Sequence, residues 1–276
     1  MSQVINTNLP SLNAQRNLNG TNLQMAVAIQ RLSSGLRVNS AKDDAAGLAI
    51  AERMNSQVRG MNVAIRNSND GISMAQVAEG ALGKVSDMLQ RMRELAVQAA
   101  NATNGDSDRK NLDSEYQQLA DEITRTITGA KFNGAEVLAA GSGDKVFQIG
   151  PGTTAQDTFT IEAGDFTAKT EFTDVMNGNV LDVDNSTDSM DNIDALLTEV
   201  NAERATWGAA QNRFEAIIAN LQISVESQSA ARSRIMDADY AAETAALTRT
   251  QVLQQAGTAM LAQANQLPQN VLQLLG

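Results

Sequence analysis

The chain has 276 residues with no cysteine, no histidine and a net charge of −11. The missing residue types exclude thiol chemistry, imidazole bases and the zinc sites built from these ligands, and the excess of acid argues against nucleic acid, since phosphate binding needs clustered lysine and arginine. We expect no membrane partner, because no apolar run could span one. The amino terminus lacks the basic start and apolar run of a cleaved signal peptide, which indicates a cytosolic protein or unconventional export.

Most of the negative charge lies in one segment. Residues 141–199 contain 12 acidic residues against Lys145 and Lys169. By contrast, residues 1–40 contain three arginines and no acid, and the only charge after Glu243 is Arg249. Uncharged ends can pack against identical copies without like-charge repulsion, whereas an acidic segment favours water. Chance variation in composition is the alternative interpretation of this asymmetry.

The first predicted element is a helix over residues 1–32 that ends close to Gly35. Arg31 places a cation near the negative end of the helix dipole. A glycine tolerates the positive φ with which many helices end. We therefore expect residues 33–45 to form a connector after this helix.

A second helix start is predicted inside the connector. Ser40 and Asp43 have the Ser-x-x-Asp spacing of a capping box, and this pattern places Asp43 and Asp44 in the first turn, where the helix dipole favours anions. The small residues that follow allow close helix packing. Gly35, Ser40 and Asp43 are the predicted caps of the connector.

The connector also admits a catalytic interpretation. Ser33 or Ser34 could act as a nucleophile with Lys42 as its base, or Asp43 and Asp44 could bind a metal ion. A serine–lysine pair needs a desolvated lysine and an oxyanion hole. Neighbouring aspartates on a helix point about 100° apart and need further carboxylates to hold a cation. We therefore expect no enzyme, no catalytic residue, no cofactor and no metal.

Residues 46–130 are predicted to form long helices. Within residues 45–100, the apolar side chains form two neighbouring ridges. This pattern is typical of a helix that packs on more than one side. After the turn at "NATNGD", Leu112, Tyr116 and Ile123 mark a further helix. The short loop makes this helix antiparallel to the one before it. We expect Gly129 to close it in a left-handed cap.

The rest of the chain changes character twice. Residues 131–188 are rich in Gly, Thr and Phe, and the alternation in "KVFQIG" and "DTFTIEAG" predicts strands. Residues 189–234 have the three-and-four spacing of a coiled-coil seam, and residues 235–276 return to helix. The predicted fold is mainly α: a long, antiparallel, coiled-coil-like bundle formed by both chain ends, with a small β-rich outer insertion in the middle. A purely intramolecular core is the alternative explanation of the apolar stripes.

Long stretches at both ends also resemble bacterial flagellins. They are "INTNLPSLNAQRNL", "RLSSGLRVNSAKDDAAGLAIAERM", "LQRMRELAVQAANATN", "KFNGAEVL" and "SRIMDADYAAETAALTRTQVLQQAGTAMLAQANQLPQNVLQLL". The middle, residues 141–188, is not diagnostic of the family and is short compared with flagellins that carry large outer domains.

The resemblance implies a filament subunit. In flagellins the terminal helices, here 1–32 and 235–276, line the inside of a helical filament, the long helices surround them as a rod, and the middle lies outermost. It implies a homopolymer used as a motility propeller, exported unfolded through the flagellar type III channel and located outside the cell. The alternative is a hook–filament junction adaptor with similar ends.

The resemblance also implies further partners. Arg91, Leu95 and Glu115 match an epitope sensed by a Toll-like receptor, although subunit packing would explain them equally. The tail resembles the part bound by the export chaperone and by cytosolic immune sensors, with packing in the filament wall as the alternative; its residues are Leu267, Val271, Leu272, Leu274 and Leu275. Cap and junction proteins are implied as well.

Overall fold

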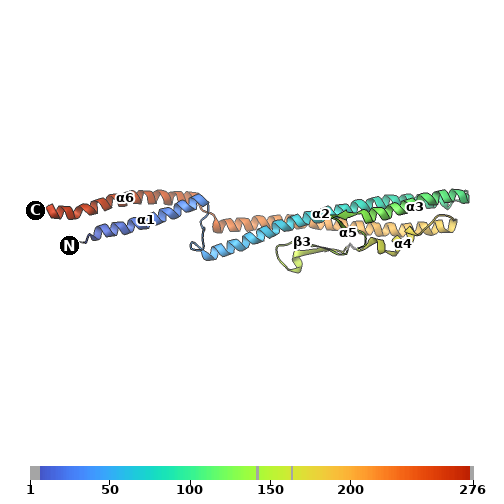
Figure 1. Cartoon of the computed structure of the whole chain (residues 1–276), viewed down its shortest axis with the longest axis horizontal. Helices are drawn as coiled ribbons and strands as arrows, with labels where there is room; N and C mark the ends of the chain where they lie inside the picture. The colour runs from blue at the N-terminus through green and yellow to red at the C-terminus, as the bar shows by residue number, and fades with distance from the viewer. Residues whose placement is uncertain (1–6, 141–142, 163, 274–276) are drawn as a thin grey trace. The chain divides into compact units, whose positions relative to one another are not determined.

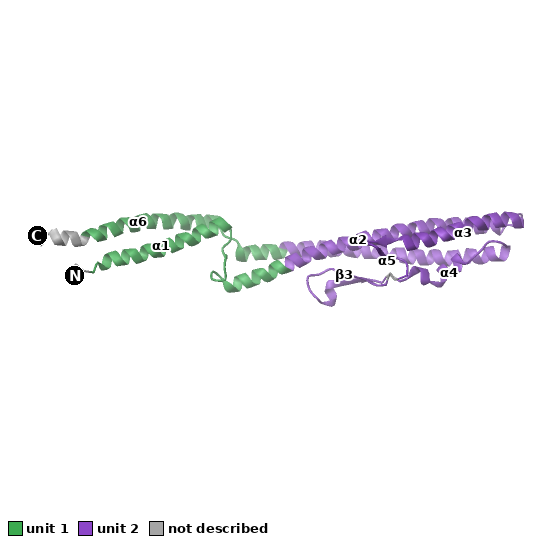
Figure 2. Cartoon of the chain, viewed as in Figure 1, with its two compact units in different colours: residues 1–56, 227–276 green, residues 57–226 purple. Residues whose placement is uncertain are grey.

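The structure is a computed structural model that describes residues 7–140, 143–162 and 164–273, with side chains up to residue 266. It is mainly α, and long helices from both ends of the chain pack together with small antiparallel strand elements from the middle (Figure 1). Contacts divide the chain into two compact units: residues 1–56 with 227–276, and residues 57–226 (Figure 2). Within the described residues, no helix combines the length and apolarity that a membrane span requires.

Four of the long helices begin after a side chain that caps their first turn. Helix α1 (Leu9–Ser34) follows Asn8, whose side chain accepts from the Ser11 N–H at 3.1 Å. Aspartates occupy the same position before three other helices, because a carboxylate satisfies free N–H groups and opposes the helix dipole. These aspartates are Asp44 before α2 (Ala45–Ala99), Asp182 before α5 (Val183–Met236) and Asp239 before α6 (Tyr240–Gln273).

In the unit of residues 57–226, α2, α5 and α3 (Asp106–Gly129) enclose one apolar core. Contacts show that α2 and α5 are antiparallel, since Gly71 lies against Phe214 whereas Arg93, further along α2, pairs with Asp194. The seam predicted for residues 189–234 is buried at Ile193, Val200, Trp207 and Phe214, each 0% exposed. The predicted antiparallel bundle of long helices is confirmed.

The middle of the chain contributes two short hairpins. Strands β1 (Lys131–Phe132) and β2 (Ala135–Glu136) are joined by Asn133 and Gly134, both with positive φ, as a two-residue turn of this type requires. Strands β3 (Lys145–Gln148) and β4 (Thr158–Ile161) pair antiparallel, which confirms the strands expected in "KVFQIG" and "DTFTIEAG".

The middle segment differs from the expectation in two ways. It also contains the short helices η1 (Ala155–Asp157), η2 (Phe166–Ala168) and α4 (Thr170–Met176), and α5 already starts at Val183.

The left-handed cap expected at Gly129 is wrong, because Gly129 is still helical and Ala130 follows it with φ −72°. Strand β1 begins directly after Ala130, at Lys131. The positive φ values occur in the hairpin turn that follows β1, at Asn133 and Gly134.

Three aromatic rings attach the β3–β4 hairpin to the helices. Phe214 on α5 meets Phe147 and Phe159 edge-to-face, with ring centroids 5.2 and 4.9 Å apart. Gly71 on α2 leaves the space for this ring, because a Cβ there would lie 2.5 Å from Phe214 Cζ. The contact is therefore closed to any larger side chain on α2.

Two glycines of α2 provide a test of this packing. Alanine favours helix over glycine by about 1 kcal/mol, so Gly80→Ala, with open space around its Cβ, should stabilise the chain. Gly71→Ala should destabilise it, because overpacking a filled core costs about 1–3 kcal/mol and outweighs the gain in propensity. Urea unfolding followed by Trp207 fluorescence measures both variants. If both variants had the same, higher free energy of unfolding, the tight contact between Gly71 and Phe214 would be contradicted.

Candidate assembly surface and connector

Helices α1 and α6 lie side by side and antiparallel (Figure 1). Polar pairs cross their seam: Ser11 hydrogen-bonds Asn265 at 2.8 Å, Asn22 hydrogen-bonds Gln254 at 3.0 Å, and Arg31 pairs with Glu243 at 2.9 Å. The half-buried Leu18 also lies in the seam, where its Cδ1 would be 3.3 Å from a Cβ at Gly257. The buried residues of the described parts of the two helices are Ser11, Ala28, Thr250 and Ala264, each 3–7% exposed. The seam thus sets the register of the pair and buries no large apolar side chain completely.

Eight large apolar residues of these helices are instead exposed. We call this set the terminal apolar surface; it comprises Leu9, Leu12, Leu23, Val27 and Ile29 on α1 and Val252, Leu253 and Met260 on α6, each 42–71% exposed. At 100° per residue, Leu9, Leu12, Leu23 and Val27 fall within about 60° of arc, turned away from Ser11 in the seam. Exposed apolar sets of this kind mark interaction surfaces.

Charge is nearly absent from this helix pair. Apart from the Arg31–Glu243 pair, α1 carries Arg16 and the described part of α6 carries Arg249. A surface with so few charges has little desolvation cost or like-charge repulsion to overcome when it is covered. The arrangement suits association with another apolar, uncharged surface.

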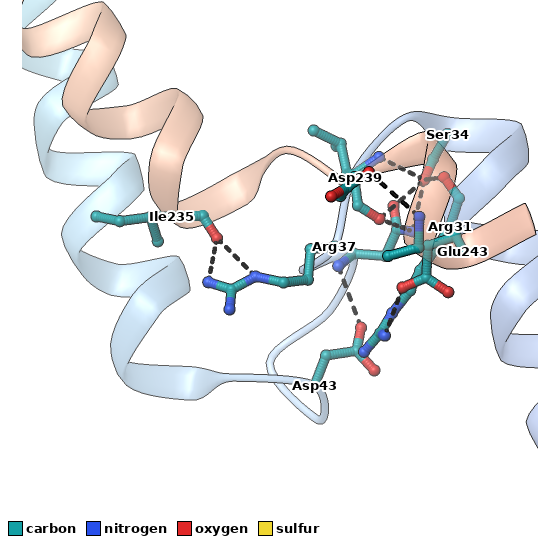
Figure 3. A network of polar contacts seen from close by, with 10 residues as sticks. Arg31, Ser34, Arg37, Asp43, Ile235, Asp239 and Glu243 are labelled. Carbon is teal, nitrogen blue, oxygen red and sulfur yellow. Dashed lines mark hydrogen bonds and ion pairs between the residues drawn. The ribbon is translucent and has the colours of Figure 1, made fainter. Parts of the chain in front are cut away.

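The connector ties the two chain ends together through the backbone (Figure 3). Gly35 ends α1 with φ 72°, and its carbonyl accepts from the Ala238 N–H at 2.9 Å. The Arg37 N–H donates to the Met236 carbonyl at 2.6 Å, and the Arg37 guanidinium donates to the Ile235 carbonyl at 2.7 Å. A small cluster of Val38, Ala51 and Met236 packs beneath these bonds.

The start of α2 differs from the prediction. Asp43 lies in a turn before the helix, where its carboxylate accepts from the Asn39 N–H, the Ser40 N–H and the Ser40 hydroxyl at 2.9–3.1 Å. The hydrogen bond from the Asn39 backbone is the main cause that lowers the pKa of Asp43. The prediction that Ser40 starts the helix with Asp43 in its first turn is wrong, because Asp43 closes this separate turn. Asp44 is the N-cap and accepts from the Gly47 N–H at 2.8 Å.

Ser34, one of the two candidate nucleophiles of the connector, has structural partners. The Ser34 hydroxyl accepts from the Leu36 N–H at 3.1 Å and from the Asn39 amide at 2.7 Å. Lys42 is exposed and is not among its partners. In the described residues, no group of three or more Asp or Glu side chains is placed to hold a metal ion.

Residues from the second half of the chain complete the connector, and the sequence prediction missed them. The Asp239 carboxylate caps α6 by accepting from the Ala241 and Ala242 N–H groups. The Tyr240 hydroxyl donates to the Leu32 carbonyl at 3.1 Å. An aspartate directly before a helical stretch is a signal for Asp239, whereas no local pattern indicates the contacts of Tyr240 or Arg37.

The structure separates the three residues of the expected receptor epitope. Arg91 on α2 and Glu115 on α3 form an exposed ion pair at 2.8 Å. Leu95 is only 1% exposed and belongs to the core. A receptor cannot touch a side chain buried in this way, so a surface role for Leu95 is wrong. Leu95 packs beneath the helix surface one turn after Arg91.

The expected tail residues lie outside the residues whose side chains are described. They are Leu267, Val271, Leu272, Leu274 and Leu275.

Comparisons with known proteins agree at both ends of the chain. Residues 5–142 match the bacterial flagellin N-terminal helical region, and residues 190–275 match the bacterial flagellin C-terminal helical region. The chain is 47% identical to the flagellin of Halalkalibacterium halodurans over 273 residues, which cover 99% of each protein. It is 41% identical to the flagellar filament 33 kDa core protein of Treponema phagedenis over 287 residues, again 99% of each.

A solved structure is similar as well. The crystal structure of Bacillus cereus flagellin superposes with a TM-score of 0.51 at 34% identity, over 56% of this chain and 88% of that one. With both helical regions matched and relatives aligned over nearly their whole length, the chain belongs to the bacterial flagellin family.

Proposed function

We propose that copies of this chain polymerise into the flagellar filament through the terminal apolar surface. The observation that carries the proposal is the packing of α1 and α6, whose described parts bury no large apolar side chain completely and leave eight of them exposed, while polar pairs such as Asn22–Gln254 cross the seam. A pair of helices without a large apolar core is marginal in water. Covering the exposed residues with further copies supplies the missing burial.

The filament requires a particular kind of contact. A head-to-tail contact between identical subunits that does not close into a ring produces a helical fibre. The nearly uncharged helices tolerate close stacking of many copies, and the acidic segment of residues 141–199 favours a position in contact with water. The runner-up, a hook–filament junction adaptor, has less support, because relatives aligned over the whole chain are filament proteins.

The assembled protein is located outside the cell, because the flagellar filament is extracellular. Export in an unfolded state through the flagellar type III system, without a cleaved signal, is part of the proposal, with an export chaperone bound to the tail around Leu272 and with cap and junction proteins at the filament ends. The similarity to flagellins over nearly the whole chain supports it.

Two further roles concern local sites. The connector from Gly35 to Asp44 holds the adjoining ends of α1 and α6 together, supported by its bonds to Ile235, Met236 and Ala238. Recognition by a host Toll-like receptor is assigned to the exposed Arg91–Glu115 pair, on the basis of the family resemblance.

Placing a charge on the terminal apolar surface should block assembly. Leu23→Asp and Leu253→Asp would each bury an unpaired carboxylate between copies, so extension of filament seeds should slow about tenfold or more. Helix content, measured by circular dichroism, should stay close to the original. Val146→Asp, at a residue 64% exposed on β3, is the matched control and should extend seeds normally. Extension of seeds by both leucine variants at the unmodified rate contradicts the proposal.

The connector is tested at Gly35. A non-glycine residue at φ 72° costs about 1–2 kcal/mol, so Gly35→Ala should speed hydrogen exchange of the Ala238 amide about fivefold or more. Gly20→Ala is the control, because Gly20 lies in α1 with open space around its Cβ. That variant should leave the Ala238 amide as protected as before. If the Ala238 amide exchanged at the same rate in the two variants, the connector would not depend on the positive φ of Gly35.

The receptor contact is tested with two arginines of the same helix. Arg91→Ala should reduce activation of the receptor by the monomer, measured in a reporter cell. Arg93→Ala should not, although Arg93 is similarly exposed and pairs with Asp194. Loss of either exposed ion pair costs only about 0–1 kcal/mol of stability, so a difference reports recognition. Equal loss in both variants would place the contact elsewhere.

A further inference from the structure

One methionine is chemically set apart from the rest. Met260 on α6 is 64% exposed, and it is the single exposed methionine among the ten that the structure describes. Four of the others are nearly inaccessible, namely Met61, Met74, Met92 and Met236, at 0–7% exposed. The remaining five, Met25, Met54, Met88, Met176 and Met190, are half-buried.

Few other side chains compete with Met260 for an oxidant. The chain has no cysteine, and its one tryptophan, Trp207, is 0% exposed. Thioethers react with peroxides and hypochlorous acid, whereas the phenol of the exposed Tyr240 is inert to hydrogen peroxide alone and is chlorinated by hypochlorous acid much more slowly than a thioether is oxidised. In the folded monomer, Met260 is therefore the most accessible soft nucleophile of the described residues.

The location of Met260 gives its oxidation a consequence. It lies seven residues after Leu253, on the same side of α6, and both belong to the terminal apolar surface. A thioether packs there as an adaptable apolar side chain. A sulfoxide is polar and chiral and disrupts methionine-containing interfaces.

We infer that Met260 is an oxidation site whose sulfoxide blocks subunit addition, so that peroxide or hypochlorous acid stops filament growth at the level of the monomer. The inference rests on the proposed assembly through the terminal apolar surface. The block of subunit addition is reversible, because methionine sulfoxide reductases convert the sulfoxide back to the thioether. Subunits already in the filament are protected, since the same contact covers the sulfur.

The chemistry balances without a cofactor. With hydrogen peroxide, a sulfur lone pair attacks one oxygen, the O–O bond breaks and an S–O bond forms. Sulfur loses two electrons, and the other oxygen leaves as water after taking up the proton. One oxygen atom is transferred, and the charge of the chain is unchanged.

The test uses the full-length monomer treated with limiting hydrogen peroxide, with oxidation sites mapped by peptide mass spectrometry. Met260 should be oxidised before the other described methionines, and extension of filament seeds should fall about tenfold or more. Incubation with sulfoxide reductases should restore extension. Met260→Leu keeps the volume and apolar character and should extend seeds at the normal rate before and after peroxide. Met260→Gln, a polar mimic of the sulfoxide, should be slow without peroxide.

Three results would overturn the inference. Normal extension by monomer that is fully oxidised at Met260 would show that the sulfoxide is tolerated. Loss of extension after peroxide in Met260→Leu as well would move the sensitive site elsewhere. Oxidation of Met260 in intact filaments as fast as in the monomer would show that assembly leaves the sulfur uncovered. Failure of the proposed function is separate, because it appears as normal extension by untreated Leu253→Asp.

Discussion

The structure depends on where the apolar side chains of its long helices are buried. In residues 57–226, α2, α3 and α5 enclose them, and Trp207, Tyr116 and Phe214 are fully buried in one core. In the helix pair of α1 and α6, eight large apolar side chains remain exposed to water. Since apolar burial is the main favourable term in folding, the unit of residues 57–226 can be stable alone, whereas in the proposed assembly the helix pair of α1 and α6 gains much of its burial from other copies. This difference separates a folded monomer from a filament subunit.

Polar contacts carry out a different task from the apolar ones. Aspartate caps at Asp44, Asp182 and Asp239 start helices, and the backbone bonds around Gly35 join two segments about 200 residues apart. In the seam of α1 and α6, the pairs Asn22–Gln254 and Arg31–Glu243 set the register. Each such bond contributes only about 0.5–1.5 kcal/mol, so these contacts specify a geometry that burial between copies then stabilises.

The exposed terminal apolar surface also links assembly to chemical sensitivity. A surface kept open for polymerisation exposes whichever reactive group lies on it, and in a chain without cysteine that group is the thioether of Met260. In the proposed assembly, polymerisation covers the sulfur. In a folded subunit, Met260 is thus open to oxidation until the subunit is incorporated into the filament.

Sequence reasoning reached the helical architecture because the three-and-four spacing of residues such as Val200, Trp207 and Phe214 is a local, repeated signal. It also reached the family and the uncharged ends, which depend on residue identity alone. It failed where neighbouring residues compete for one role. Asp43 and Asp44 are both suited to cap α2, and only the folded connector shows that Asp43 is occupied by Asn39 and Ser40. Likewise, the exposure of Met260 and the burial of Leu95 depend on which helix covers each face, a fact of tertiary packing that the local pattern does not contain.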